Sequence, residues 1–339
     1  MTQPLTPRRL ALICAALGGV LFVTMIFALK LGAVPISVTD LAMLLLRKLT
    51  GAVETLPAEY RMIVFEIRLP RILMGILVGA SLSVAGAGFQ ALLRNPLADP
   101  YVLGVSSGAA LGAILSLVVA SGPTIATPLA AFAGAGAAIT LVYFLGRRQG
   151  QLDSYTLLLA GIITASFLSA LIIFLMTTLS GRDLRGMAFW LMGDLSSPSP
   201  VAPGWLFLVM LAAVGAIYTT AADLNLLLSG EQEAMHLGVD VARVKLVVYL
   251  SASVLTGLAV SVSGAIGFVG LLVPHVIRLL FGSDYRVLIP AAALGGAIAI
   301  VLTDALARTL VAPTELPVGA MTAMAGAPLF LYLLRRRLS

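Results

Sequence analysis

Long apolar runs, repeated along nearly the whole chain, limit its fold more than any other feature. A helix needs ~20 mainly apolar residues to cross the bilayer core, and about ten segments reach or approach that length. They are residues 10–31, 72–93, 101–121, 125–146, 155–179, 201–222, 244–263, 266–282, 287–307 and 316–334. Only 11% of the 339 residues are charged and the mean hydropathy is +1.07, whereas soluble domains are about a quarter charged. We therefore expect an all-α polytopic membrane protein with a single transmembrane domain over residues 1–339.

Basic residues at both ends of the sequence predict its orientation. Arg8 and Arg9 precede the first apolar run, and residues 335–337 are three arginines that follow the last run. An even number of spans places both ends on one side, and the positive-inside rule makes that side cytoplasmic. The first run is too long for the apolar core of a signal peptide, so we expect an uncleaved helix. Both termini are predicted to be cytoplasmic.

Two polar segments interrupt the apolar pattern. In the predicted external loop 32–71, Ser37 and Asp40 have capping-box spacing before an apolar stretch, and Gly51 follows as a stop signal. This pattern predicts a short amphipathic helix on the outer surface. The second segment, residues 223–245, is the largest predicted cytoplasmic loop.

Small residues recur at four-residue spacing in two of the predicted spans. The positions are Gly75 and Gly79 in one span, then Gly104, Gly108 and Gly112 in the next. Such spacing lets helix backbones approach closely in lipid. We interpret these glycines as helix-packing positions.

Several classes of transport chemistry lack the residues that they need. Ion-coupled transporters place ionisable groups at mid-membrane, and none of the predicted spans has one near its centre. Asp304 comes nearest, but it lies near a span end and one turn from Arg308, which favours an i,i+4 ion pair. His236 and His275 are the only histidines, and no carboxylate cluster joins them, so a site for a bare metal ion is not expected. The single Cys14 provides no disulfide framework.

No nucleotide site is expected either. A P-loop requires Gly directly before Lys, whereas the three lysines follow Leu, Arg and Val. We therefore expect a non-enzymatic membrane subunit whose energy comes from a partner. An ion-coupled secondary transporter of a small solute is the alternative. An intramembrane enzyme is a third possibility, for which the sequence offers no polar catalytic cluster.

Several longer motifs occur in order along the chain. They are Arg68-Leu69-Pro70-Arg71, Gly79-Ala80-Ser81-Leu82, Asn95-Pro96-Leu97-Ala98-Asp99-Pro100, Leu103-Gly104-Val105-Ser106-Ser107-Gly108-Ala109, Gly267-Phe268-Val269-Gly270-Leu271, Val273-Pro274-His275-Val276-Ile277-Arg278, Glu315-Leu316-Pro317-Val318-Gly319 and Gly326-Ala327-Pro328. Together with Ala85-Gly86 and Gln90, these motifs closely resemble the FecCD family of ABC importer permeases. The resemblance covers nearly the whole chain.

The resemblance implies a type II ABC importer permease fold of about ten helices in the bacterial cytoplasmic (inner) membrane. It further implies a homodimer with the substrate path along its axis, two cytoplasmic ATPase subunits that bind ATP and Mg, and an external or periplasmic substrate-binding protein. No cofactor in this chain and no nucleic-acid partner are implied. The family's cargo is a metal chelate: ferric siderophore or heme is favoured because iron chelates are its commonest cargo, and cobalamin comes next.

The resemblance also implies roles for particular residues. Arg68, Arg71 and Arg308 match the arginines that dock the binding protein through its acidic residues, with headgroup snorkelling as the alternative. Ser154 and Leu158 match the cytoplasmic translocation gate. The match to the family's ATPase-coupling helices covers Gly230, Glu231, Ala234, Leu237, Gly238 and Val239. A solvated linker is the alternative for that loop.

Overall fold

Helices make up nearly all of the computed structural model, which describes residues 6–32, 34, 36–49, 58–120, 126–148, 151–177, 187–188, 190–196, 203–311 and 314–338. The helices are α1 (Pro7–Lys30), α2 (Val38–Leu49), α3 (Ala58–Arg61), α4 (Leu69–Leu92), α5 (Val105–Ala120), α6 (Ala126–Leu145), α7 (Ser154–Thr177), α9 (Pro203–Thr219), α10 (Ala221–Leu227), α11 (Glu231–His236), α12 (Val241–Ser263), α13 (Val269–Phe281), α14 (Tyr285–Ala307) and α15 (Val318–Leu338). The π-helix η2 (Met62–Arg68) joins α3 to α4, and the 3-10 helix η3 (Pro100–Leu103) precedes α5.

Each of the predicted spans contains one of these helices. Within the described ranges, six helices are long and apolar enough to cross a membrane: α1, the continuous helix Glu59–Leu92, α6, α7, α12 and α14. The pair α9 and α10 satisfies the same test with a bend of 49° between its halves, and α5, α13 and α15 contain shorter apolar helices. The all-α polytopic fold class is confirmed.

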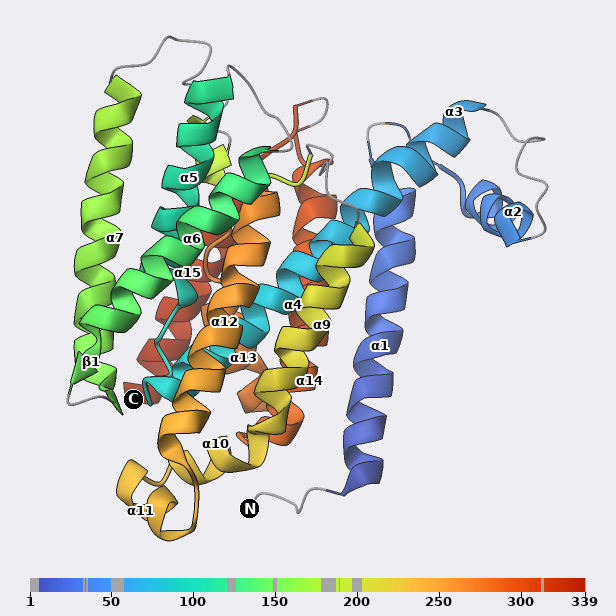
Figure 1. Cartoon of the computed structure of the whole chain (residues 1–339). Helices are drawn as coiled ribbons and strands as arrows, with labels where there is room; N and C mark the ends of the chain where they lie inside the picture. Colours follow the sequence, from blue (N-terminus) through green and yellow to red (C-terminus); the bar gives the residue numbers. More distant parts are fainter. Residues whose placement is uncertain are drawn as a thin grey trace.

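Helix α4 forms the centre of the bundle. It is buried along most of its length and packs against α12, α13 and α14. Figure 1 shows α4 inside the bundle, with α1 and α7 at opposite edges. A Cβ on Gly79 would overlap the carbonyl of Gly296 in α14, and one on Gly86 would overlap the carbonyl of Gly270 in α13. The glycines therefore let the backbones of α4 and its neighbours touch.

The other glycines of the predicted pattern do not all serve close helix packing. A Cβ on Gly108 would meet Gly134 and one on Gly112 would meet Ala130, which confirms close packing of α5 on α6. At Gly75 a Cβ would make only ordinary contacts, the nearest at 3.4 Å. Gly104 ends η3 with φ +77°, a left-handed conformation that glycine adopts without strain.

The predicted amphipathic helix is present as α2. Ser37 Oγ accepts a hydrogen bond from the Asp40 amide at 3.0 Å, the expected cap. Leu41 and Leu44 are buried in a small apolar cluster with the end of α1 and with η2, and Figure 1 shows α2 beside the main bundle. Gly51, the predicted stop, lies outside the described residues.

The structure departs from the sequence-based boundaries in three places. The helix containing α4 begins at Ala58 rather than at residue 72, because α3 and η2 continue it backwards through the predicted loop. A two-stranded antiparallel ladder, β1 (Arg147–Arg148) with β2 (Gln151–Leu152), precedes α7. The predicted loop 223–245 is largely helical, because α10, α11 and the start of α12 lie within it.

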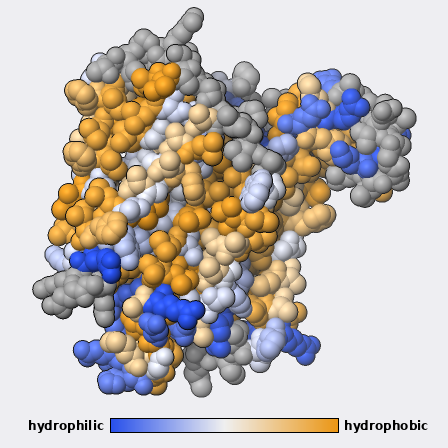
Figure 2. Space-filling model, viewed as in Figure 1, coloured by the Kyte–Doolittle hydropathy of each residue, from blue (hydrophilic) through white to orange (hydrophobic). Residues whose placement is uncertain are grey.

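Hydrophilic and apolar side chains are distributed unevenly along the long axis of the bundle. Figure 2 shows apolar residues spread over the body of the bundle and hydrophilic residues at its lower end and around α2 and α3. In Figure 1 the start of α1, the end of α15, the β1–β2 ladder and α10–α11 all lie toward the lower end. The elements predicted to be cytoplasmic therefore share one end, and the assignment of that end to the cytoplasm stays a prediction.

Candidate functional site

Three buried arginines and two carboxylates form a cluster at the end of the bundle opposite α11. This arginine cluster consists of Arg68, Arg71, Asp304, Arg308 and Glu315. Asp304 accepts from Arg71 Nε at 2.8 Å through one oxygen and lies 3.1 Å from Arg308 Nε through the other. Arg71 Nη1 also pairs with Glu315 Oε2 at 2.8 Å. One carboxylate thus joins α4 to α14, and the predicted i,i+4 pair of Asp304 with Arg308 is confirmed.

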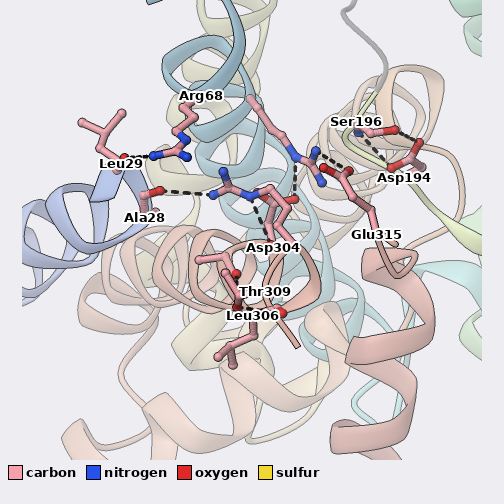
Figure 3. Close-up of polar contacts among 12 residues, drawn as sticks. Ala28, Leu29, Arg68, Asp194, Ser196, Asp304, Leu306, Thr309 and Glu315 are labelled. Atoms are coloured by element: carbon pink, nitrogen blue, oxygen red, sulfur yellow. Dashed lines mark hydrogen bonds and ion pairs between the residues drawn. The ribbon is translucent and has the colours of Figure 1, made fainter. Parts of the chain in front are cut away.

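Two of these arginines also bind the end of α1. Arg68 Nη1 donates to the carbonyl of Leu29 at 2.6 Å, and Arg308 Nη2 donates to the carbonyl of Ala28 at 3.3 Å, as Figure 3 shows. Helix ends leave their last carbonyls without intrahelical donors, and a cation there also interacts favourably with the helix dipole. The two guanidinium groups therefore cap α1.

The docking arginines predicted from the resemblance are thus brought together, but as buried groups. Their exposed fractions are 4% for Arg68, 7% for Arg71 and 6% for Arg308. Arg71 Nη2 is buried without a hydrogen-bond partner among the described residues. Sequence reasoning missed Glu315 as a member of this cluster, since 244 residues separate it from Arg71.

A second cluster of polar contacts lies at the lower end. We call residues 221–240, which hold α10 and α11, the coupling segment, after the role that the resemblance predicts for its residues. Gly230 has φ +138° before α11 and Gly238 has φ +87° after it, so glycine is used at both bends, as expected. Ala234 is fully buried, whereas Leu237 is 65% exposed. The segment therefore seats one face on the bundle and exposes an apolar tip.

Glu231, the first residue of α11, holds the coupling segment to the bundle. Its Oε2 lies 2.6 Å from Lys245 Nζ, and its Oε1 lies 3.7 Å from Arg94 Nη2 at the end of α4. Lys245 Nζ also donates to the carbonyl of Leu152 in β2 at 3.0 Å. Sequence reasoning missed Lys245, although a lone lysine among Val and Leu at the base of an apolar helix could have indicated a buried, paired group.

The predicted gate residues lie beside this cluster. Ser154 is the first residue of α7, and its Oγ donates to the carbonyl of Leu92, the last residue of α4, at 3.0 Å. Leu158 lies one turn further along α7 and is half-buried. The structure thus places the start of α7 against the end of α4.

The motif that contains Pro274 is held by one side chain from α4, Gln90. Proline lacks an N–H, so the carbonyl of Gly270 loses its usual donor four residues on. Gln90 Nε2 replaces it, at 3.3 Å from the Gly270 oxygen and 3.4 Å from the Leu271 oxygen. Arg278 Nη1 in turn donates to Gln90 Oε1 at 2.6 Å. These contacts fix the short helix α13 on α4.

Metal ligands do not gather anywhere in the part of the chain that the structure describes: no group of three His, Cys, Asp or Glu side chains there could hold an ion. His275 is buried in α13, and His236 is exposed at the end of α11. The described polar contacts named above, at both ends of the bundle, are ion pairs and hydrogen bonds.

Comparison with known proteins gives consistent matches over most of the chain. The model of the FecCD transport family matches residues 20–336. The cobalamin import system permease protein BtuC of Halobacterium salinarum is 46% identical over 281 residues, which cover 83% of this chain and 75% of that protein. The hemin transport system permease protein HmuU of Yersinia pestis is 43% identical over 284 residues, which cover 80% of this chain and 83% of that protein.

The fold agrees with a solved structure of a metal-chelate type ABC transporter in an inward-facing conformation. The two chains are 31% identical and superpose with a TM-score of 0.81. The match covers 96% of this chain and 99% of that chain. The family match spans nearly every helix described above, and it contains both the arginine cluster and the coupling segment. The resemblance inferred from the motifs is therefore confirmed, and the chain belongs to the FecCD transport family of ABC transporter permeases.

Proposed function

We propose that this chain is the membrane-spanning subunit of an ABC importer that carries a metal chelate into the cytoplasm, with both termini on the cytoplasmic side. The observation that carries the proposal is the coupling segment. Its short helix α11 is fixed to the lower end of a FecCD-family bundle, and its apolar tip is exposed. Such a helix can transmit motion from a separate ATPase subunit as a rigid body. The relative named for cobalamin import supports the direction, and together with the relative named for hemin transport it supports the class of cargo.

The cargo that we propose is an iron chelate, heme or a ferric siderophore, with cobalamin as the second candidate. Hemin and cobalamin both carry their metal already enclosed by a macrocycle. A path for such molecules needs no ligands for a bare ion. The two named relatives have nearly equal identity to this chain, so the identity values do not choose between the cargoes.

Reconstitution tests this function directly. The permease is placed in proteoliposomes with its copurifying ATPase subunits and binding protein, and uptake of hemin, a ferric siderophore and cyanocobalamin is measured with and without ATP. The proposal expects uptake of one chelate that requires both ATP and the binding protein. Uptake that persists without the ATPase and collapses with an uncoupler would instead establish an ion-coupled secondary transporter.

For docking of the binding protein we propose the arginine cluster, through Arg68, Arg71 and Arg308. Long planar guanidinium groups suit bidentate pairing with acidic residues. Arg71 supports the proposal most directly, because its Nη2 has no hydrogen-bond partner among the described residues. A docking carboxylate has to reach a buried nitrogen, so docking requires a small opening around Glu315, whose side chain is 46% exposed.

The docking proposal is tested with Glu315→Gln rather than with charge reversal of the buried arginines. Loss of the Glu315 charge leaves Arg71 paired to Asp304 alone and more available to a partner carboxylate. The affinity of this variant for the binding protein is measured at several ionic strengths. We expect the affinity to rise, or else to remain dependent on salt. Affinity that is independent of salt in both the variant and the parent chain would count against docking by arginines.

We also propose that two copies of the chain pair, with α7 along the path and Ser154 and Leu158 at its cytoplasmic gate. Supporting this, α7 lies at one edge of the bundle (Figure 1) and exposes apolar side chains such as Ile163 and Phe167, both 60% exposed. A cysteine in place of Ile163 or Phe167, in a Cys14→Ser background, should cross-link two chains in membranes. Cross-linking at Phe22 of α1 but not at α7 would contradict this pairing.

A further inference from the structure

Lys245 is a buried lysine whose two partners both come from other elements. Its side chain is 6% exposed, and it lies near the start of α12. Nζ makes an ion pair with Glu231 Oε2 at 2.6 Å and donates to the carbonyl of Leu152 at 3.0 Å. A buried ammonium is stable only while such partners compensate for its lost hydration. Lys245 therefore favours arrangements that keep Glu231 and Leu152 close together.

One of these partners belongs to the coupling segment and the other leads into α7. Glu231 is the first residue of α11, whereas Leu152 is the last residue of β2. Between Leu152 and α7 stands only Asp153, whose carboxylate accepts from the amide and hydroxyl of Thr156 at 2.8 and 2.6 Å. This N-cap ties Asp153, the residue after Leu152, to the first turn of α7, which gives a displacement of Leu152 a direct route to the start of α7.

The neighbouring contacts are weaker or do not involve the coupling segment. Arg94 also faces Glu231, but at 3.7 Å and with its side chain 45% exposed, where water screens the charge. Ser154 joins α7 to the end of α4 through Leu92 without touching α11. Among the described contacts, α11 is therefore linked to the residues before α7 through Lys245. This buried lysine contacts Glu231 on one side and Leu152 on the other.

We infer that Lys245 is a positioning residue that makes the inner end of α7 follow the movement of the coupling segment. The inference rests on the proposed function, because it needs an ATPase that moves α11 and a gate at the start of α7. A pull on α11 moves Glu231, the ion pair moves the ammonium group, and the hydrogen bond moves Leu152. The movement reaches the gate without passing through the core of the bundle.

Lys245→Met removes the charge and keeps the length of the side chain. In proteoliposomes with the ATPase subunits and binding protein, this variant should still hydrolyse ATP while chelate uptake per ATP falls about tenfold, a typical coupling between two sites. Lys245→Arg should restore much of the ratio. Arg243→Met, the same charge change at an exposed position on the same helix, should leave the ratio unchanged.

A distance measurement separates this role from a merely structural one. Spin labels replace the exposed Met235 on α11 and Tyr155 on α7 in a Cys14→Ser background, and labelled chains are diluted with unlabelled ones. The distribution of distances between the labels should stay narrow through the ATP cycle in the parent chain and should broaden in Lys245→Met. If Lys245→Met does not fold, Glu231→Gln takes its place, because its side chain is 29% exposed.

The outcomes distinguish the inference from the proposed function. A parent transporter without ATP-dependent uptake would overturn the proposed function. A parent transporter that is coupled, alongside Lys245→Met or Glu231→Gln variants with unchanged uptake per ATP and unchanged label distances, would overturn the role of Lys245 alone.

Discussion

The arginine cluster and the coupling segment are both held by ion pairs, but the pairs join different kinds of structure. In the arginine cluster, three cations and two carboxylates join long helices of the bundle, and Asp304 is 2% exposed. In the coupling segment, Glu231 ties a helix of six residues to the bundle, and that helix leaves Leu237 65% exposed. The upper cluster joins parts of the bundle to each other, whereas the lower one joins the bundle to a short helix at its surface.

On the proposed function, this difference separates residues that hold the fold from residues that would transmit motion. A network centred on two long helices that pack together, α4 and α14, resists displacement, because moving one helix leaves buried charges uncompensated. A single buried pair at the base of a small exposed helix permits that helix to move as a unit. Substitutions in the arginine cluster should therefore lower stability first, and substitutions in the coupling segment should lower coupling first.

The largest effect should come from Asp304→Asn. The change leaves Arg308 buried beside a neutral partner and Arg71 paired to Glu315 alone, and removing one member of a buried pair costs about 3–5 kcal/mol. Glu315→Gln is the control: its side chain is 46% exposed, and partly exposed pairs contribute about 0–1 kcal/mol. The free energy of unfolding is measured by SDS titration in detergent micelles. Equal losses in both variants would remove the distinction between a buried brace and an exposed pair.

A smaller loss should follow from Gly79→Ala, below the arginine cluster on α4. The added methyl group would overlap the carbonyl of Gly296, and forcing α4 and α14 apart costs about 1–3 kcal/mol. Gly136→Ala in α6 meets nothing within 4 Å, so that control should gain up to about 1 kcal/mol from helix propensity. If both variants unfold at the same SDS fraction, the glycines of α4 do not set the contact with α14.

The sequence could predict what depends on local pattern. Apolar runs of membrane length located the helices, and Ser37 with Asp40 located α2, because caps act over three residues. The pair of Asp304 with Arg308 followed from helical spacing alone. The start of the helix before α4 was missed, since Glu59 and Glu66 lower the hydropathy there while the backbone remains helical.

The sequence could not predict contacts between distant segments. Arg71 meets Glu315 across 244 residues, and Lys245 meets Leu152 across 93; neither separation carries a local signal. The burial of Arg68 depends on the end of α1, whose carbonyls it caps. Packing between helices decides these neighbours, so the resemblance could supply candidate residues for the sites but not their partners.

Leu237→Asp should weaken binding of the ATPase with little effect on the stability of the chain. An apolar anchor in a protein interface contributes about 1–2 kcal/mol or more, so affinity should fall roughly 5–30-fold. Gln232→Asp places the same charge at another exposed position of the coupling segment and should change affinity little. Binding is measured with the purified ATPase by surface plasmon resonance in nanodiscs. An unchanged affinity in Leu237→Asp would show that the exposed tip is not the contact.

The smallest effect concerns Asp284, which joins the coupling segment to α14. Its carboxylate caps α14 through the Arg286 amide at 3.0 Å and accepts from Asn225 of α10 at 2.8 Å. Hydrogen bonds from the Arg286 side chain, opposed by partial burial and assisted by Asn225, lower the pKa of Asp284 to about 2. Asp284→Ala should cost about 1 kcal/mol, as for other lost N-caps.

The lowered pKa of Asp284 gives this last prediction a pH dependence of known sign. The folded pKa lies below the unfolded value of about 3.9, so the charged carboxylate stabilises the fold fully above about pH 5 and loses that contribution as the pH falls toward 2. Asp284→Asn keeps an acceptor oxygen but cannot titrate. The difference in melting temperature between parent and Asp284→Asn should therefore shrink between pH 5 and pH 3, and Ser283→Ala should follow the parent. A difference that stays constant over this range would mean that the charge of Asp284 does not join the coupling segment to the bundle.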